Sequence, residues 1–275
     1  MGYSNIDSRR HMFVICAYKE SAHLRQCIDS IKNQSVQSPI ICATSTPNEY
    51  VSDICAEYGI PLIINPVQAG TASDWNFAYD QADTPLVTLA HQDDIYEPEF
   101  LELTLKYLNR AKKPLIAFTN YYEIRDGEKT IKNRLLRIKR LMCAPWCIRM
   151  FWASRFVGRR IFMFGNPIMC PTVTIAKENL QGITVFDKDY RGSCDYIAWV
   201  EVRNLPGEFV YCPTLLLGHR IHIESETSNR IADNTRNRED LKILLMLSPK
   251  PIARLIHRFY IKSQSSNTVR GEKDA

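Results

Sequence analysis

The stretch that decides the fold is Pro85-Leu86-Val87-Thr88-Leu89-Ala90, which runs directly into His91-Gln92-Asp93-Asp94. The apolar run has the length and composition of a buried strand, and it delivers two adjacent carboxylates to that strand's carboxyl end. Buried carboxylates are costly unless a cation meets them, and such oxygen ligands suit a hard divalent metal that carries a diphosphate. Ligand sites of open α/β sheets also lie at the carboxyl ends of strands, so position and chemistry agree.

A second interpretation of the same two carboxylates is structural. A helix is expected to begin near Pro98, and acidic side chains favour helix N-termini because they accept hydrogen bonds from the free amides there. Asp93 and Asp94 would then cap that helix. The motif taken alone leaves both interpretations open.

The segments around this motif alternate between strand-like and helix-like patterns. Short apolar runs predict strands, and apolar residues at helical spacing predict helices between them. This alternation predicts a largely parallel sheet flanked by helices, in a nucleotide-binding type of architecture. No G-x-G-x-x-G or G-x-x-x-x-G-K motif follows the first strand, which argues against dinucleotide oxidoreductases and P-loop kinases. The expected strands are 12–17, 40–43, 61–65, 85–90 and 114–118, and the expected helices are 20–34, 51–58, 73–82 and 99–109.

Composition limits the class of protein. The chain has 275 residues, of which 45% are hydrophobic and 24% charged, as in an ordinary globular protein. Its nine cysteines are odd in number and lie mostly in apolar runs, so we expect reduced core residues of a cytosolic protein. The first residues carry no apolar signal core, and no stretch is long and apolar enough to span a membrane. We therefore expect a cytoplasmic protein.

The net charge of +5 is distributed unevenly. No Asp or Glu occurs between Glu128 and Glu178, and the basic residues there are interleaved with aromatic and aliphatic ones. This pattern suits an anionic membrane surface, and the stretch 251–262 repeats it. The alternatives are a solvated basic face over a buried apolar stripe and a nucleic-acid groove. The last is the weakest, because no recognised nucleic-acid module surrounds the stretch. We expect peripheral contact with the inner face of the cell membrane and no nucleic-acid partner.

Several short motifs, in a consistent order over residues 12–225, are similar to those of one enzyme family. The opening strand and its Tyr18-Lys19-Glu20 turn, and then His91-Gln92-Asp93-Asp94, resemble the start and the metal motif of family 2 glycosyltransferases. The chain departs from the family pattern at Thr44-Ser45-Thr46, at His91 and at Cys194, where acidic residues are common. The remaining similar segments are the helix 24–35 with Gln34-Ser35, Asn65 and Gly70 with the helix of Asn76, Gly165-Asn166-Pro167, Cys170-Pro171-Thr172-Val173, Cys194-Asp195 at a helix start, and Arg220-Ile221-His222 on a strand.

The resemblance implies a GT-A fold, an inverting mechanism and a nucleotide-sugar donor. Inversion needs one base for the acceptor hydroxyl and one electrophile for the departing diphosphate. Asp195 is the candidate base; it could also cap its helix, and the two roles are compatible. Asp93, Asp94 and His222 are the candidate ligands of Mg or Mn, although a lone histidine on a strand is more often structural. The expected organisation is a single domain over 1–262, with a nucleotide-sugar half (12–123), an acceptor-side half (124–225), C-terminal helices (226–262) and a disordered tail (263–275).

Donor contacts are expected at the carboxyl ends of the first strands. Tyr18 is expected to stack on the base and Glu20 to contact the ribose or the base. A UDP-sugar is the expected donor, although the sugar and the base, uridine or thymidine, stay open. Asp74 could replace the missing acidic pair or could cap its helix. The full set of expected donor-binding residues is Tyr18, Glu20, Thr44, Asp74, Asn76, Gln92 and Asp93.

We thus expect an inverting glycosyltransferase that adds one sugar to a lipid-linked precursor of a surface polysaccharide or glycolipid. In one alternative, the basic segment from about Arg125 to Arg160 stabilises the leaving group without a metal. In another, the chain is a catalytically silent, membrane-associated protein that binds a polysaccharide or a partner transferase. Asp93 and Asp195 argue against a silent protein.

Overall fold

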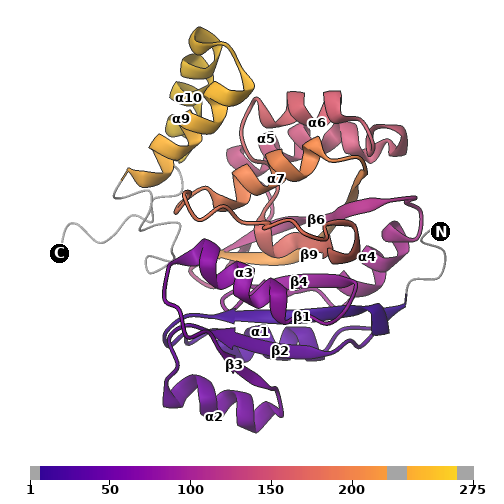
Figure 1. Ribbon diagram of the computed structural model, residues 1–275, viewed down its shortest axis with the longest axis vertical. Helices are drawn as coiled ribbons and strands as arrows, with labels where there is room; N and C mark the ends of the chain where they lie inside the picture. The colour runs from indigo at the N-terminus through magenta and orange to yellow at the C-terminus, as the bar shows by residue number, and fades with distance from the viewer. Residues whose placement is uncertain (1–6, 222–233, 265–275) are drawn as a thin grey trace.

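The computed structural model describes residues 7–221 and 234–264. A central sheet is flanked by helices, with α2 at one end of the molecule and α5, α6, α9 and α10 at the other (Figure 1). The strands are β1 (His11–Ala17), β2 (Ile40–Thr44), β3 (Leu62–Ile64), β4 (Leu86–His91), β5 (Ile95–Tyr96), β6 (Pro114–Arg125), β7 (Glu128–Thr130), β8 (Val173–Ala176) and β9 (Glu208–Ile221). The α-helices are α1 (Leu24–Lys32), α2 (Glu49–Tyr58), α3 (Thr71–Gln81), α4 (Phe100–Leu108), α5 (Arg134–Cys143), α6 (Arg155–Phe162), α7 (Cys194–Asn204), α9 (Thr235–Leu247) and α10 (Lys250–Gln264).

The sheet is mixed and mostly parallel. Its strand order is β3-β2-β1-β4-β8-β6-β9-β5, and β7 pairs with β6. Strands β3, β2, β1 and β4 are parallel neighbours, β8 is inserted antiparallel to both β4 and β6, and β6 is parallel to β9. The central strand β1 is buried on both faces, which is why it is a continuous apolar run and not an alternating one. The predicted α/β class with a mixed, mostly parallel sheet is confirmed.

The strands and helices predicted for the first 110 residues are present, with ends that shift by a few residues. The end of α2 at Tyr58 agrees with the prediction, because Gly59 adopts φ 63° and ends the helix through left-handed capping. Strand β6 extends to Arg125, well beyond the predicted 114–118. Its second part pairs with β9, a strand about 95 residues further along the chain, and local pattern cannot reveal such pairing.

The two halves share one sheet, because β6 and β9 pair along nearly their whole lengths. The single-domain organisation stays a prediction, which this continuous sheet supports. Helix α10 reaches Gln264, so the tail expected from 263 starts two residues inside a helix, and the rest of it, 265–275, lies outside the described residues. Within 7–221 and 234–264, no helix has the length and apolarity needed to cross a bilayer.

Candidate active site

The candidate site lies where the parallel strands β1, β2 and β4 end. The register places Ala17 beside Thr44 and Cys16 beside His91, so three loops leave the sheet at the same edge. These loops carry the Tyr18 turn, the Ser45 turn and the Asp93-Asp94 pair. Convergence at the carboxyl edge is the usual position of ligand sites in such sheets.

Asp94 is held by the end of strand β9. The carboxylate is fully buried, and its Oδ1 accepts a hydrogen bond from the backbone N–H of Arg220 at 3.0 Å. Nδ1 of His219 lies 3.0 Å from the same oxygen. The N-cap of α4 is Glu99, and Asp94 has its partners on β9, so the structure does not support the capping interpretation.

Arg220 joins three elements at this point. Its Nε donates to the carbonyl of Asp93 at 3.0 Å, and its Nη2 donates to Oε1 of Gln26 on α1 at 2.9 Å. The guanidinium therefore fixes the backbone of the acidic motif against α1. This explains the arginine of the Arg220-Ile221-His222 motif, whereas His222 itself lies outside the described residues.

The residues at this edge fit a divalent cation. His91, Asp93 and Asp94 each offer one ligand atom, and these atoms lie within 4.8 Å of one another. His91 Nε2 and Asp94 Oδ2 are buried and make no hydrogen bond within the described structure. Buried polar atoms without hydrogen-bond partners are costly, and Oδ2 of Asp94 lies 4.0 Å from Nδ1 of His91, so a cation bound beside this oxygen would supply its missing interaction. One imidazole and two carboxylates suit Mn²⁺, and the two carboxylates suit Mg²⁺.

His91 is a ligand candidate that the sequence analysis had taken only as a departure from the family pattern. Its ring stacks on Trp75 with centroids 4.9 Å apart. Burial lowers the pKa of His91, against the opposing charges of Asp94, Asp93 and Asp195, so the neutral imidazole prevails near neutral pH. Neutral imidazole is the form that binds metals.

His219 has the opposite electrostatic balance. Burial lowers the pKa of His219, but the Asp94 carboxylate, aided by Asp93 and Glu123, outweighs it and raises the pKa above the usual 6.5. His219 therefore compensates the charge of Asp94 inside the protein, while His91 remains available as a neutral ligand.

Gln92 fixes the shape of the Tyr18 turn. Its Oε1 accepts from the backbone N–H of Tyr18 at 3.1 Å, and its Nε2 donates to the Tyr18 carbonyl at 2.8 Å. Both ends of the amide are thus occupied by one residue of the neighbouring turn. The Tyr18 ring is 49% exposed, as stacking on a ligand would require.

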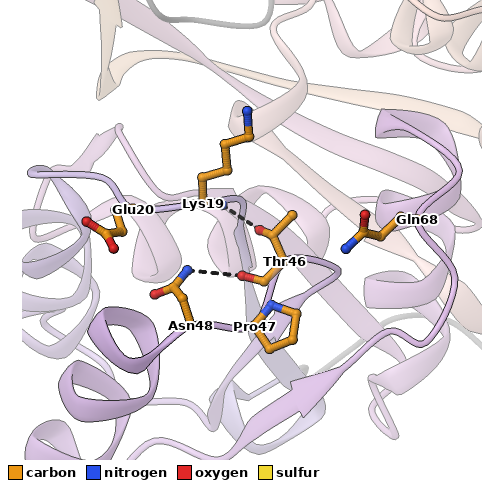
Figure 2. Close-up of a pocket in the computed structure, with 6 residues that line it drawn as sticks. All are labelled: Lys19, Glu20, Thr46, Pro47, Asn48 and Gln68. Atoms are coloured by element: carbon orange, nitrogen blue, oxygen red, sulfur yellow. Dashed lines mark hydrogen bonds between the residues drawn. The ribbon is translucent and has the colours of Figure 1, made fainter.

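An open pocket of about 620 Å³ lies between the turns that follow β1 and β2 (Figure 2). The backbone N–H of Lys19, which has φ 55°, donates to Oγ1 of Thr46 at 2.5 Å, and Nδ2 of Asn48 donates to the Thr46 carbonyl at 3.0 Å. Glu20 lines the pocket, as expected of a donor contact, and Thr46 brings the two turns together. The complete lining is Lys19, Glu20, Thr46, Pro47, Asn48 and Gln68.

The structure places Thr44 and Asp74 behind the pocket wall. The Thr44 hydroxyl accepts from the backbone N–H of Thr46 at 3.0 Å. The Asp74 carboxylate accepts from Ser45 Oγ at 2.9 Å and from Asn65 Nδ2 at 3.0 Å, and burial raises its pKa. Asp74 is not the N-cap of α3, which is Gly70, so it orders the two loops at the pocket's inner side.

Asn76 contacts a more distant part of the chain. Its Nδ2 donates to the carbonyl of Phe186 at 2.7 Å, and its Oδ1 accepts from the backbone N–H of the same residue at 3.0 Å. Both groups of this buried amide are satisfied by the loop before α7. The geometry gives Asn76 a loop-ordering role, and it is not among the residues that line the pocket.

Asp195 lies in the first turn of α7 and faces Asn166. The Asn166 Nδ2 donates to Asp195 Oδ2 at 2.8 Å, while Oδ1 accepts from the backbone N–H of Tyr196 at 2.8 Å. The N-cap position of α7 belongs to Ser193, so Asp195 is the second residue of the helix. Its charge opposes the lowering of the His91 pKa by burial, so Asp195 lies within electrostatic reach of the acidic motif.

Glu239 on α9 holds the turn that leads to Asp195, and the sequence analysis missed it. Its two oxygens accept from the backbone N–H groups of Arg191, Gly192 and Ser193, each at 2.8 Å. Asp240 accepts from Ser193 Oγ at 2.7 Å. No local signal predicts this contact, because it joins segments nearly 50 residues apart.

Comparison with known proteins agrees with this geometry. The sequence pattern of glycosyl transferase family 2 matches residues 12–176. The chain belongs to glycosyl transferase family 2. This family 2 chain is thus a glycosyltransferase, and it has no match among curated proteins.

Solved glycosyltransferase structures share the GT-A fold of this family 2 chain. A mannosyltransferase, PcManGT from Pyrobaculum calidifontis, in complex with GDP-Man and Mn²⁺, matches with a TM-score of 0.65 at 12% identity, over 99% of this chain and 80% of that chain. S. aureus TarS 1–349 in complex with UDP-GlcNAc matches with a TM-score of 0.63 at 11% identity, over 93% of this chain and 72% of that chain. At such identities the similarity establishes the fold.

Proposed function

We propose that this family 2 glycosyltransferase moves one sugar from a nucleotide-diphosphate sugar to a saccharide acceptor with inversion at the anomeric carbon. The observation that carries the proposal is a cluster of His91, Asp93 and Asp94 at the carboxyl edge of the sheet, together with a further carboxylate, Asp195, at the start of α7. The three clustered residues could hold a cation, and the charge of Asp195 acts on His91. The cluster suits a cation that would neutralise the diphosphate, and Asp195 suits the acceptor hydroxyl.

Asp195 is the proposed general base. It takes the proton of the acceptor hydroxyl as that oxygen attacks the anomeric carbon and the bond to the diphosphate breaks. The nucleoside diphosphate leaves with the bonding electrons. Asn166 holds one carboxylate oxygen of Asp195 and so fixes the direction in which the base faces the acceptor.

Asp93, Asp94 and His91 are the proposed holders of Mg²⁺ or Mn²⁺, with His222 as a further candidate. The bound cation would supply charge stabilisation to the departing diphosphate. Arg220 and His219 keep the acidic motif in place from the β9 side. The complex of the PcManGT structure with GDP-Man and Mn²⁺ supports this assignment.

The pocket next to the Tyr18 turn is the proposed nucleotide site. Tyr18 would stack on the base, Glu20 would contact the ribose or base, and Gln92 would keep the turn in shape. A uridine diphosphate sugar is the first donor to test, since the TarS structure holds UDP-GlcNAc. The proposed acceptor is a lipid-linked saccharide at the inner face of the cell membrane, because the acceptor-side half carries the basic and aromatic segment.

The test is donor binding and donor hydrolysis across a panel of nucleotide sugars, with and without Mn²⁺. We expect one donor to raise the melting temperature and to be hydrolysed slowly by the wild type. Asp93→Ala should abolish both effects, whereas Asp53→Ala, an exposed carboxylate on α2, should change neither. A folded wild type that responds to no donor would overturn the proposed donor site.

A further inference from the structure

The exposed apolar side chains of this protein are concentrated at one end. Twelve of the 17 large hydrophobic side chains that are exposed in 7–221 and 234–264 belong to two segments. One segment is α5 to α6 with the residues just after it, and the other is α9 with α10. Figure 1 places both segments at the end of the molecule opposite α2. The twelve residues are Ile138, Leu141, Ile148, Met150, Phe156, Phe164, Leu245, Met246, Ile252, Leu255, Phe259 and Ile261.

Helix α10 presents an apolar stripe that no other described element covers. Ile252, Leu255 and Phe259, at helical positions i, i+3 and i+7, are 46%, 54% and 68% exposed. The opposite side of the helix packs on α9 through the fully buried Ala253. Exposed cations flank the stripe, namely Lys250, Arg254 and Arg258.

The segment from α5 to α6 repeats this chemistry. Leu141 and Met150 are each 75% exposed, and Phe156 is 70% exposed. The Arg160 guanidinium lies 5.0 Å over the Phe156 ring, so cation and aromatic ring form one exposed unit. The other exposed cations of this segment are Arg134, Arg137, Arg149, Arg155 and Arg159.

Acidic residues are missing from α5, α6 and α10. No Asp or Glu occurs from 129 to 177 or from 241 to 271. The two acidic residues of α9, the half-buried Glu239 and the buried Asp240, are hydrogen-bonded to the turn before Asp195. The charged side chains of α5, α6 and α10 are therefore all cations. A second copy of the same surface would repel this one, and nucleic acid would leave the protruding Leu141 and Met150 without an apolar partner. An anionic bilayer satisfies both components, because acyl chains accept the apolar groups and headgroups accept the cations.

We propose that α5, α6 and α10 together form a docking surface for anionic phospholipid. The docked protein would lie with α2 away from the bilayer, and the acceptor-side half would face it. The inference rests on the proposed function in one respect: docking would bring the enzyme to a lipid-linked acceptor at the membrane surface. Its test requires no turnover, so the two proposals can fail separately.

The test is flotation of the full chain with vesicles of pure phosphatidylcholine and of phosphatidylcholine mixed with phosphatidylglycerol. We expect binding to the mixed vesicles only, and weaker binding at higher salt. Arg254→Gln combined with Arg258→Gln should weaken binding about 30-fold, since each cation near the headgroups contributes a factor of roughly five. Lys106→Gln, an exposed cation on α4, is the matched control and should bind as the wild type does.

The apolar component is tested separately. Phe259→Ser and Phe156→Ser should each reduce binding, whereas Ile64→Ser, on the edge strand β3 and 53% exposed, should not. The melting temperature without any ligand should be unchanged in all these variants, which shows that they fold. Equal recovery with both vesicle types, or preference for RNA over anionic vesicles, would overturn the proposal. So would an effect of Ile64→Ser as large as that of Phe259→Ser.

Discussion

The hydrophobic core of this enzyme is continuous, but its composition differs between the expected nucleotide-sugar half (12–123) and the expected acceptor-side half (124–225). In the nucleotide half, β1 packs aliphatic and phenyl side chains such as Phe13, Val14 and Ile15, none of which is exposed. In the acceptor-side half, the core is aromatic and encloses one buried cation, Arg203, whose guanidinium lies 4.5 Å over the Phe209 ring. The strands and helices of the nucleotide half can be predicted from short-range sequence patterns. The structure of the acceptor-side half depends on contacts between segments that are distant in the sequence. The expected effects of mutation differ accordingly.

The largest effect is expected from the acceptor-side half at Asp195. Asp195→Asn removes the proposed base but keeps a similar shape, so turnover should fall by about 10² to 10⁴. Donor binding should be retained, because the acceptor contact and the donor pocket lie on different loops. Steady-state transfer and the donor thermal shift measure the two effects. Asp189→Asn, an exposed carboxylate on the loop before α7, should leave both unchanged.

A smaller effect is expected on stability when the buried cation is removed. Arg203 donates to the carbonyls of Trp152 at 2.8 Å and of Gly207 at 2.6 Å, and burial lowers its pKa to about 10. Arg203→Met leaves both carbonyls without these charged donors, and the relief of guanidinium desolvation offsets only part of that loss. We expect the free energy of unfolding to fall by about 2 kcal/mol in urea titrations. The exposed Arg238→Met is the control, and equal stability of both variants would contradict the assigned role.

A variant of Glu239 tests whether helix α9 positions the proposed base, Asp195. Glu239→Gln weakens three charge-assisted hydrogen bonds to the turn before Asp195. We expect kcat to fall about tenfold at an unchanged KM for the donor, because only the base side is displaced. Glu239→Asp should recover part of the loss, and Glu201→Gln, on the exposed side of α7, should have no effect. A change confined to the donor KM would exclude a role in positioning Asp195.

In the nucleotide half, the effect expected from His11 is on the pH dependence of stability. This residue is fully buried, with Nδ1 3.0 Å from Ser38 Oγ and Nε2 2.8 Å from Thr88 Oγ1. Burial lowers the pKa of His11 to about 3, against 6.5 in the unfolded chain. The unfolded chain then binds more protons between these values, so the His11 contribution is complete above about pH 6.5 and decreases as the pH falls.

The expected slope from His11 is about 1.4 kcal/mol of unfolding free energy per pH unit below 6.5. Urea titrations at pH 7, 6 and 5 measure it, and His11→Gln should reduce the slope by that amount. The difference between the two proteins isolates His11 from His91 and His219. Parallel pH curves would show that His11 is protonated as easily in the folded protein as in the unfolded chain.

Candidate site residues could be predicted from the sequence where their position depends on local pattern alone. The sequence identifies Asp93 and Asp94 as candidates because a buried strand ends at them, and that position follows from the chain's own pattern. His91 belongs to the same cluster, yet its imidazole was taken as a departure, since only the geometry shows its Nε2 buried without a hydrogen bond. The role of Thr46 could not be predicted either, because it joins two turns through a contact with the backbone of Lys19.

The sequence by itself determined the alternating strands and helices of the nucleotide half, the acidic motif at the end of β4 and the two basic amphipathic segments. These features depend on the spacing of hydrophobic residues along the chain and on neighbours within a few residues. Only the tertiary structure decided that β9 delivers His219 and Arg220 to Asp94, that Asn166 meets Asp195, and that α9 holds the turn before it. Those contacts join residues 29 to 127 positions apart, and such pairing is selected by the packing of the whole sheet.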